Sequence, residues 1–476
     1  MKALLLSCLL LPLAGLTQSV DSLNELTAIR FVEAFNSQNY KLLRSQFAGP
    51  LKLLFNEKRA KEAFGTQLEV KGKITHYKIV RVKPNTLRMQ LRYSRDTTEW
   101  NQLGMNFNSK NKMNGISFRA PSFRFSTADS MALGRPRPAR VWAMDSLFEL
   151  KRNTGVFSGC VLVADSLGRM HYRCSDGYDE NTVFELASVS KQFTAVAVLQ
   201  LVAQGKVGLD EAITTYLPTL PYKKVTVRML LQHTSGLPDY MELFDKHWDK
   251  TKIARNSDVV ALLAKYKPKP DFSAGKRYEY SNTGYVLLAS IVEATSGKPF
   301  ADYIQQQLFK PLNMYSSRVF HRRLSGELPP RLALGRVWSD SLQRFVLPDD
   351  LPNYDFVRFL DGISGDGCVN STLADLERWI DGLRQGAVLP DSLLQLAWTP
   401  SPQSREAGEA YGFGWSVSDA PNTVGHVNHS GSWPGYTTFV LVLREQKGHV
   451  FVLSDNDYSN TVLYARHLTS WLLNRK

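Results

Sequence analysis

The sequence predicts an α+β protein with two domains, and three observations support this. The chain has 476 residues, of which 43% are hydrophobic and 21% charged, as in globular proteins. Residues 20–125 begin with a helical pattern and continue as strands, whereas helix and strand patterns recur from residue 141 to residue 476. Between them, residues 126–140 (STADSMALGRPRPAR) are rich in small residues, Arg and Pro, which is typical of a linker.

Residues 1–19 have the layout of a cleaved secretory signal peptide. Lys2 precedes an apolar run from Ala3 to Leu16, and the small and polar residues that follow place the expected cleavage near Ser19. A retained N-terminal anchor is the alternative. No later stretch of 18 or more apolar residues occurs, so we expect a secreted or periplasmic protein that is not an integral membrane protein.

Three cysteines remain once such a signal is removed. Cys160 and Cys174 flank a predicted hairpin, GCVLVADSLGRMHYRC, and could face each other across it in an oxidising compartment. A disulfide and two packed thiols are equally compatible with this pattern. Cys368 is then left without a partner.

The first domain, residues 20–125, is predicted to be small, basic and α+β. Its helix is indicated by Leu23, Leu26, Ile29, Val32 and Phe35, which recur every three residues. In TLRMQLRY, residues 86–93, apolar and polar residues alternate, which predicts a half-buried strand with a basic outer face. The order and size of these elements resemble the cone-shaped folds related to nuclear transport factor two.

The positive charge is concentrated in this first domain. The whole chain has 58 Lys+Arg and 44 Asp+Glu, a net charge of +14, while residues 20–125 hold 19 Lys+Arg and 8 Asp+Glu, so 19 − 8 = +11. Such a surface suits an anionic envelope component as a partner, or is simply a well-hydrated basic face. Nucleic acid is not expected as a partner of an exported protein.

The stretch VFELASVSKQFTAVAVLQLVAQGK, residues 183–206, contains the candidate nucleophile. FTAVAVLQLVA is apolar on nearly every side and predicts a buried central helix. Ser188 suits an N-cap, but Lys191 replaces the Glu or Gln of a capping box and opposes the helix dipole. A desolvated lysine loses affinity for its proton, so Lys191 could activate the Ser188 hydroxyl on the same helix face.

Ser-x-x-Lys alone is a weak signal, because it occurs three times in this chain. SKNK at 109–112 lies in a polar stretch, and SAGK at 273–276 lies in a loop after two prolines. Neither precedes an apolar helix. Only Ser188 and Lys191 combine the spacing with a setting of low dielectric.

From residue 141 to residue 476 the chain resembles the serine β-lactamase-like hydrolases, in the branch of class C β-lactamases, D-alanyl-D-alanine carboxypeptidases, D-aminopeptidases and related esterases. The resemblance rests on several blocks of sequence: ELASVSKQFTAVAVLQLVAQGKVGLDEAITTYLP, VTVRMLLQHTSGLPDY, YEYSNTGYVLLASIVEATSGKPFADYIQQQLFKPLNM, GDGCVNSTLADLERW, YGFGWSV and NHSGSWPGYTTFVL. It implies an antiparallel sheet flanked by helices, with an all-helical region.

The resemblance also implies roles for individual residues. Ser188 would be acylated, and Lys191 and Tyr280 would share the proton transfers, with Tyr280 as the favoured general base. Asn282 would hold a substrate amide and position Lys191. The backbone N–H groups of Ser188 and Ser432 would form the oxyanion hole, and the substrate would lie along the strand of His429, Ser430 and Gly431. No metal or cofactor is implied.

Two residues depart from the usual family pattern. The third motif is His429-Ser430-Gly431, where β-lactamases and carboxypeptidases usually have Lys, and a histidine is mostly neutral at neutral pH. A substrate without a free carboxylate is therefore favoured over a β-lactam. Cys368 stands where Gly is commoner; we expect a buried small residue, although a thiol near the site could be oxidisable.

Three further residues have competing interpretations. His233, in QHTSGLPDY, is expected to be a structural turn residue rather than a catalytic base. Trp433 and Tyr436 either line the cleft or pack inside the protein, and the sequence does not choose between these.

YSNT occurs twice, at 280–283 and 458–461. The first copy precedes the helical run YVLLASIVEATSG, and we expect it to carry the chemistry. The second copy is predicted to be a strand–turn–helix joint in which Ser459, Asn460 and Thr461 are good N-cap residues.

The leading hypothesis is therefore an exported serine hydrolase that acts through an acyl-enzyme on a D-amino-acid peptide, a cell-wall fragment or a small ester. A class C-type β-lactamase or D-alanyl-D-alanine carboxypeptidase is the first alternative. A non-catalytic binding or sensor protein of the same fold is the second, although Ser188, Lys191, Tyr280 and Asn282 together argue against it. The oligomeric state does not follow from the sequence.

Overall fold

The computed structural model describes residues 23–48, 72–119 and 136–473, together with positions 60, 61, 64 and 68. Within these ranges, residues 84–85, 94–95, 108–111, 154, 156, 340, 343, 407–409, 420–423, 446 and 458 are not described. The predicted signal peptide, most of the predicted linker, and Tyr458 lie outside the described residues. The chain divides into two compact units, Met1–Arg124 and Phe125–Lys476.

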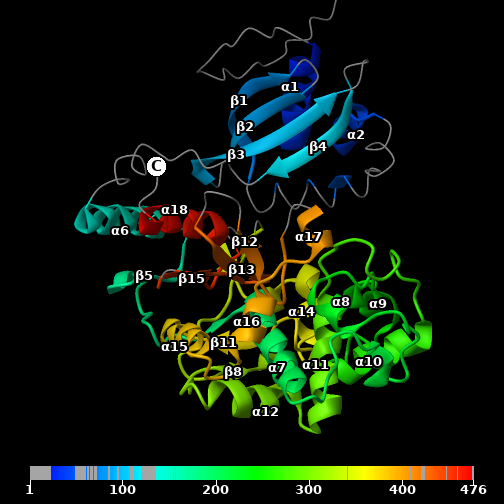
Figure 1. Cartoon of the computed structure of the whole chain (residues 1–476). Coiled ribbons are helices and arrows are strands. Elements are labelled where there is room, and N and C mark those ends of the chain that lie inside the picture. The colour runs from blue at the N-terminus through cyan, green and yellow to red at the C-terminus, as the bar shows by residue number, and fades with distance from the viewer. Residues whose placement is uncertain are drawn as a thin grey trace, which may run out of the picture. The chain divides into compact units, whose positions relative to one another are not determined.

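The described part of the first unit includes the helices α1 and α2 and a four-stranded antiparallel sheet in the order β1-β2-β3-β4 (Figure 1). The described elements are α1 (Leu23–Asn36), α2 (Tyr40–Ser45), β1 (Ile74–Lys83), β2 (Thr86–Tyr93), β3 (Asp96–Phe107) and β4 (Met113–Arg119). The strand predicted for residues 86–93 is confirmed by β2, whose Leu87, Met89 and Leu91 are buried.

These strand residues share a core with Phe31 and Phe35 of α1, as the helical stripe in the sequence predicts. The basic outer face predicted for β2 rests on side chains that the structure does not describe. The likeness of this unit to a cone-shaped fold stays a prediction.

The second unit is built on a six-stranded antiparallel sheet in the order β12-β13-β14-β15-β5-β6. These strands are β12 (Ser416–Ser418), β13 (His426–Trp433), β14 (Tyr436–Leu443), β15 (His449–Ser454), β5 (Gly159–Asp165) and β6 (Gly168–Cys174). The early hairpin β5–β6 thus completes a sheet whose other strands come from the end of the chain.

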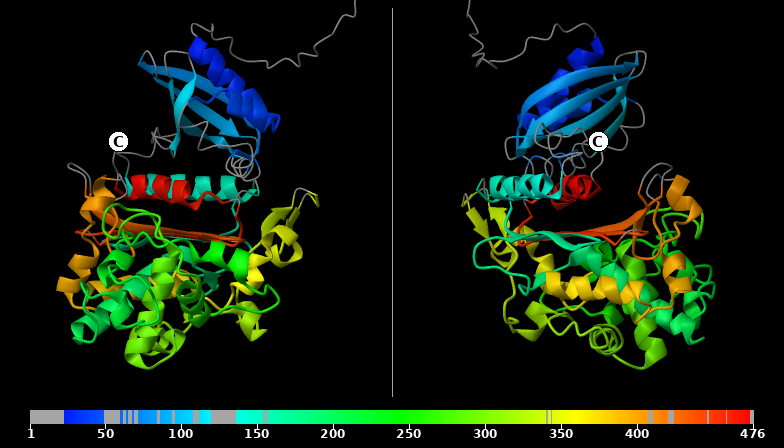
Figure 2. Two further views of the ribbon diagram at one scale, coloured as in Figure 1. Left: turned by 90° about the vertical axis from the view of Figure 1, so that its right-hand side faces the viewer. Right: turned by 60° about the vertical axis from the view of Figure 1, so that its left-hand side comes forward.

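Helices cover both faces of this sheet (Figure 2). The helices α6 (Arg137–Asn153) and α18 (Thr461–Leu473) lie on one face, where Phe148, Leu468 and Trp471 pack with apolar side chains from β5, β14 and β15. The opposite face meets the helical region of the unit. Every residue of β15 is buried, because both faces of that strand are covered.

The helical region contains the buried helix that the sequence predicts. This helix is α7 (Lys191–Ala203), in which ten residues from Lys191 to Leu201 are buried. Phe193 lies 4.4 Å, between ring centroids, from Trp379. The remaining helices are α8 (Val227–Leu231), α9 (Tyr240–His247), α10 (Asn256–Tyr266), α11 (Asn282–Ser296), α12 (Phe300–Ile304), α13 (Arg322–Ser325), α14 (Phe356–Phe359), α15 (Leu373–Arg384), α16 (Asp391–Ala397) and α17 (Pro402–Glu406).

Two small antiparallel sheets complete the second unit. One has the order β7-β11-β8, and the other pairs β9 with β10. Their strands are β7 (Phe184–Glu185), β8 (Arg318–Val319), β9 (Val337–Ser339), β10 (Arg344–Val346) and β11 (Val369–Ser371). Because β7 immediately precedes the Ser188 turn, its pairing with β11 fixes the backbone that leads into the candidate site.

The two cysteines of the predicted hairpin are directly opposite each other and form a disulfide. Cys160 pairs with Cys174 in the β5–β6 register, and their Cα atoms are 4.1 Å apart. Of the two arrangements that the sequence allowed, the structure has the disulfide. Cys368 is a free thiol.

None of the helices in the described part of the chain combines the length and the apolar character that a membrane span requires.

Candidate active site

Ser188 lies in a tight turn that is held by hydrogen bonds to two other elements. Ala187–Ser190 form a 3-10 turn that runs directly into α7. The hydroxyl of Thr438, on β14, donates to the Leu186 carbonyl at 2.7 Å, and the Ser190 hydroxyl accepts from the Val369 N–H of β11 at 3.0 Å. Ala187 has a positive φ of 48°, which is uncommon for a residue other than glycine. The turn therefore holds Ser188 in one position at the end of a buried helix.

The Lys191 ammonium group is buried and contacts three oxygen atoms. Its Nζ lies 3.1 Å from Ser188 Oγ, 2.9 Å from Asn282 Oδ1 and 2.7 Å from the Asp366 carbonyl oxygen. Burial lowers the pKa of Lys191 to about 8, although Asp366 and Asp239 oppose the shift. A substantial fraction of Lys191 is therefore neutral near physiological pH and can accept a proton from Ser188.

Tyr280 lies beside this lysine. Its ring centroid is 5.0 Å from Lys191 Nζ and 4.2 Å from the His233 ring centroid. The pKa of Tyr280 is raised, chiefly by desolvation of its hydroxyl, while a hydrogen bond from Ser188 acts in the opposite direction. Tyr280 is thus a hydroxyl rather than a phenolate at neutral pH, and the pKa directions favour Lys191 over Tyr280 as the first proton acceptor.

His233 is a neutral turn residue that holds the segment after Tyr280. Its φ is 57°, and its Nδ1 accepts a hydrogen bond from the Ser281 N–H at 3.0 Å. Burial, followed by the charge of Lys191, lowers the pKa of His233. These contacts agree with the structural role predicted from the sequence.

His429 is also neutral and buried, and both of its ring nitrogens are engaged. Nδ1 lies 2.7 Å from the Ser430 carbonyl oxygen, so it carries the proton and donates. Nε2 therefore accepts from the Tyr411 hydroxyl, 2.9 Å away. Burial and the charge of Lys191 lower the pKa of His429 to about 3, so the ring offers no positive charge to a substrate carboxylate.

The strand β13 passes close to the Ser188 turn, and Gly431 permits this. A Cβ atom added at Gly431 would lie 2.2 Å from the Leu186 carbonyl oxygen and 2.3 Å from Thr438 Oγ1. Along β13, His429 and Gly431 are buried, whereas Ser430 and Ser432 are exposed. The strand thus places a neutral imidazole against the buried side and two serines on the open side.

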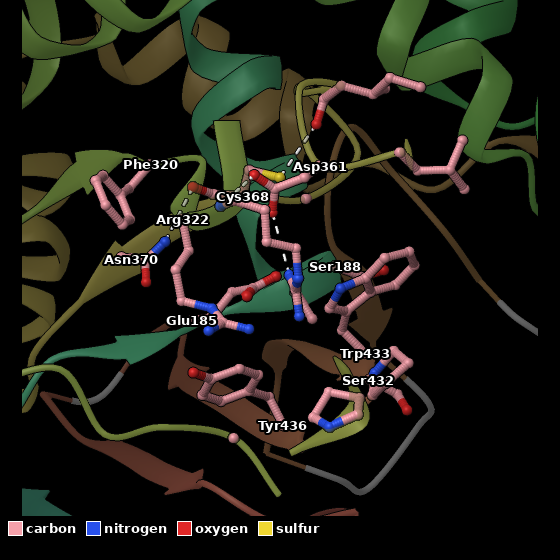
Figure 3. Close-up of a pocket in the computed structure, with 18 of the residues that line it drawn as sticks. Glu185, Ser188, Phe320, Arg322, Asp361, Cys368, Asn370, Ser432, Trp433 and Tyr436 are labelled. Atoms are coloured by element: carbon pink, nitrogen blue, oxygen red, sulfur yellow. Dashed lines mark hydrogen bonds and ion pairs between the residues drawn. The ribbon is translucent and has the colours of Figure 1, made fainter. Parts of the chain in front are cut away.

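Ser188 opens into a pocket that encloses ≈ 910 Å³ of empty space, including its open mouth (Figure 3). Asn282 and Ser432 also line it, together with Trp433 and Tyr436. The Trp433 ring packs at 5.5 Å from Phe356, and the Tyr436 hydroxyl donates to the Ala333 carbonyl at 2.8 Å. Both aromatic residues therefore line the pocket and also pack against other residues, so both interpretations left open by the sequence are correct.

Cys368 lies on the same pocket with an unusual backbone conformation. Its φ is 70°, in the left-handed region that favours glycine, which gives a physical reason for the commoner Gly at this position. The thiol donates to the Ile363 carbonyl at 3.1 Å, and burial raises its pKa, so it is a thiol rather than a thiolate. The residue as a whole is partly exposed, so the prediction of a buried small residue is wrong.

The two YSNT copies have different surroundings. In the first, Ser281 caps α11 by accepting from the Gly284 N–H at 3.2 Å, and the following residue, Asn282, contacts Lys191. In the second, Ser459 N–H donates to Asn456 Oδ1 at 2.9 Å just before α18 begins. The second copy is thus part of a strand–turn–helix joint, as predicted, while Tyr458 itself is not described.

Sequence reasoning missed three residues at this site. Tyr411 fixes the tautomer of His429 and is part of YGFGW, but the letters of that block do not reveal its partner. Asp366 supplies the third oxygen that contacts Lys191 through its backbone. Glu185 lines the pocket and precedes Ser188 by three residues. Among the described residues, no group of three or more His, Cys, Asp or Glu side chains is placed to hold a metal ion.

The fold and this cluster belong to a class of serine hydrolases, and comparison with known proteins gives the family. The family model described as Beta-lactamase matches residues 155–470, and the chain belongs to this family. The predicted β-lactamase/transpeptidase-like fold is thereby confirmed. The chain is accordingly a serine hydrolase of the β-lactamase and penicillin-binding protein family.

Three relatives illustrate the similarity. Penicillin-binding protein 4* of Bacillus subtilis is 39% identical over 335 residues, which cover 68% of this chain and 74% of that protein. The octameric penicillin-binding protein homologue from Pyrococcus abyssi is 25% identical, with a TM-score of 0.60, and covers 71% of this chain and 78% of its own. D-amino acid amidase from Ochrobactrum anthropi is 22% identical with a TM-score of 0.56 over 70% of this chain and 99% of its own, and shows the shared fold.

Proposed function

We propose that this protein is an exported hydrolase that cleaves an amide or ester bond through an acyl-enzyme on Ser188. Its substrate is a D-amino-acid peptide, a cell-wall fragment or a small ester. The observation that carries the proposal is the position of Lys191 Nζ, buried and within hydrogen-bond distance of both Ser188 and Asn282. A buried lysine with a pKa lowered to about 8 is a base suited to a serine nucleophile.

The proposed reaction has two steps. Ser188 Oγ attacks the carbonyl carbon and passes its proton to Lys191, while the backbone N–H groups of Ser188 and Ser432 stabilise the oxyanion. The C–N or C–O bond then breaks, and the leaving group takes a proton through Lys191 and Tyr280. Water attacks the resulting ester, returns a proton to Ser188 and releases the carboxylic acid. Asn282 positions Lys191 in both steps.

The neutral state of His429 supports a substrate without a free carboxylate at this strand. The imidazole cannot supply the permanent charge of a lysine, because its pKa is lowered to about 3. A D-amino acid amidase is among the proteins that share this fold. Hydrolysis of a D-amino-acid amide or an ester is therefore favoured over efficient hydrolysis of a β-lactam.

Export and envelope association complete the proposal. The signal peptide predicted at residues 1–19 and the charge of residues 20–125 favour a secreted or periplasmic enzyme that contacts an anionic envelope component. Deleting residues 21–130 should release the enzyme from the envelope fraction. Unchanged fractionation would remove this part of the proposal.

The nucleophile is tested by covalent labelling. A fluorophosphonate probe should add to Ser188 in the wild-type protein, and labelling should disappear in Ser188→Ala but persist in Ser166→Ala, a matched change in the exposed β5–β6 turn. Labelling that persists in Ser188→Ala would show that another residue is the nucleophile.

A further inference from the structure

A second group of charged residues lies in the pocket of Ser188. Glu185 comes from β7, Arg322 and Arg323 come from α13, and Asp361 precedes β11. Figure 3 shows Glu185 and Arg322 on the pocket wall with Ser188, Ser432 and Trp433 around the same space. The proposed acyl transfer does not use these charged residues, so they are candidates for determining substrate specificity.

The two arginines are already neutralised by two aspartates. Arg322 pairs with Asp349, and Arg323 Nε lies 2.7 Å from the same carboxylate. Arg323 Nη1 lies 3.1 Å from Asp361 Oδ1. Asp361 also accepts from the backbone N–H groups of Arg323 at 2.8 Å and Leu324 at 2.9 Å. Arg358, an exposed residue outside the pocket lining, also reaches Asp349, with its Nε 4.0 Å from Oδ1. Arg322 and Arg323 are thus each paired with a carboxylate on the protein.

Two further carboxylates line the pocket, those of Asp366 and Glu185. The Asp366 carboxylate accepts a hydrogen bond from the Tyr240 hydroxyl at 3.1 Å and is acted on by the charge of Lys191. In the described part of the chain the Glu185 carboxylate makes no hydrogen bond, and no ion pair within 4.0 Å. Burial raises the pKa of Glu185 to about 7; Asp361 adds to the shift, while Arg323 and Arg322 oppose it. A desolvated carboxylate without a partner is costly, and a positively charged partner would remove much of that cost.

We propose that Glu185 is a specificity-determining residue that receives an ammonium group on the acyl part of the substrate. The proposal rests on the proposed function and names its substrate class: amides or esters whose acyl group carries a free amine. Arg322 and Arg323 are not expected to bind a substrate carboxylate instead, because Asp349 and Asp361 already neutralise them. His429 likewise offers no charge to a carboxylate.

Matched nitroanilides test the proposal. D-Alanine nitroanilide is compared with isobutyryl nitroanilide, in which a methyl group replaces the ammonium, and 6-aminohexanoyl nitroanilide with heptanoyl nitroanilide. The wild-type enzyme should favour the amine in at least one pair, and the ratio of the two kcat/KM values should fall about 10- to 100-fold in Glu185→Gln. Glu185→Asp, which keeps the charge, should retain part of the preference.

Glu242→Gln is the matched control, because Glu242 is an exposed residue of α9 that pairs with Lys246 at 3.2 Å. It should keep the wild-type ratio. A purely structural effect of Glu185→Gln would lower both rates and leave the ratio unchanged, which would overturn the proposal. Preference for a succinyl nitroanilide over its neutral counterparts would also overturn it.

Fluorophosphonate labelling of the wild-type protein distinguishes failure of the proposed function from failure of the role proposed for Glu185. If the wild-type protein is not labelled at Ser188, the proposed function fails. If labelling is normal and no amine preference exists, only the role of Glu185 fails.

The pH dependence gives a second readout. Since the pKa of Glu185 is raised to about 7, its carboxylate is charged above that pH. The 6-aminohexanoyl pair is used here, because its alkyl amine, with a pKa of about 10.4 like that of lysine, stays protonated over the range measured. Where this pair shows an amine preference, the preference should appear as the pH rises through about 7. The groups whose charges act on Glu185, or on which it acts, are Arg322, Arg323, Asp361, Cys368 and Tyr436. In Glu185→Gln the ratio for the 6-aminohexanoyl and heptanoyl pair should be flat between pH 5.5 and 8.5; the same rise in that variant would overturn the assignment.

Discussion

The Tyr411 hydroxyl donates a hydrogen bond to His429 Nε2 across 2.9 Å, while Nδ1 of the same ring donates to the Ser430 carbonyl. This pair of contacts fixes one neutral tautomer, since Nε2 must keep its lone pair for Tyr411. Protonation of His429 would break the Tyr411 bond and place a second charge near Lys191. The strand beside Ser188 therefore presents a polar but uncharged surface, and this has a consequence for substrate choice.

A change of His429 to Lys should shift specificity toward substrates that carry a carboxylate. We compare kcat/KM for a D-alanyl-D-alanine peptide or a chromogenic cephalosporin with kcat/KM for D-alanine anilide. The ratio of the first to the second should rise about tenfold or more in His429→Lys, because a charge-assisted hydrogen bond to the carboxylate becomes available. His429→Gln, which stays neutral, is the control and should not raise this ratio. In the wild-type enzyme we expect the anilide or a short-chain nitrophenyl ester to be the best substrate. A dominant cephalosporin rate would contradict this interpretation.

The pH–rate profile should identify the base. The pKa of Lys191 is lowered to about 8, so the neutral amine is present above that pH and is lost as the pH falls. kcat/KM on a neutral ester should therefore fall about tenfold per pH unit well below pH 8. Because the pKa of Tyr280 is raised, a Tyr280 base would place this limb at much higher pH. Measurement between pH 5.5 and 10 decides between the two.

Tyr280→Phe tests the proton relay directly. Loss of the hydroxyl beside Ser188 and Lys191 should lower kcat about 100- to 10,000-fold, while fluorophosphonate labelling reports whether Ser188 is still in place. Tyr315→Phe is the matched control, because Tyr315 is 73% exposed. Tyr458→Phe, in the second YSNT copy, should also leave activity nearly intact. Strong loss in Tyr458→Phe with normal activity in Tyr280→Phe would overturn the site.

The sequence predicts the parts of this molecule that depend on local pattern. The apolar run after Lys191 predicts the buried helix α7, the alternation at residues 86–93 predicts β2, and the hairpin GCVLVADSLGRMHYRC brings Cys160 opposite Cys174. Whether these thiols bond depends on side-chain direction, which the pattern does not specify.

Contacts between distant segments are the part that the sequence could not predict. The sequence predicted that His429 is neutral from the ordinary pKa of histidine. In the structure, it is neutral because burial lowers its pKa and because its Nε2 accepts a hydrogen bond from the Tyr411 hydroxyl. The network around Glu185 joins β7 to residues more than a hundred positions later, and no periodicity encodes such packing. The preference for Tyr280 as general base came from family resemblance. Burial lowers the pKa of Lys191, and desolvation of the hydroxyl raises that of the partly exposed Tyr280, so both directions favour the lysine.

Gly431→Ala should show whether activity depends on the close approach of β13 to the Ser188 turn, apart from any effect on the stability of the sheet. The added methyl carbon would lie 2.2 Å from the Leu186 carbonyl oxygen, so the strand or the turn that carries Ser188 must move. A displacement of about 1 Å in a catalytic group can cost roughly 100-fold in rate, and we expect kcat/KM to fall by about that factor. Gly425→Ala, just before β13, is the control, because its nearest neighbour to an added Cβ atom is 3.8 Å away. The two variants are compared by kcat/KM on a nitrophenyl ester and by thermal unfolding. If Gly431→Ala keeps full activity, the contact between β13 and the Ser188 turn is not required to position the nucleophile.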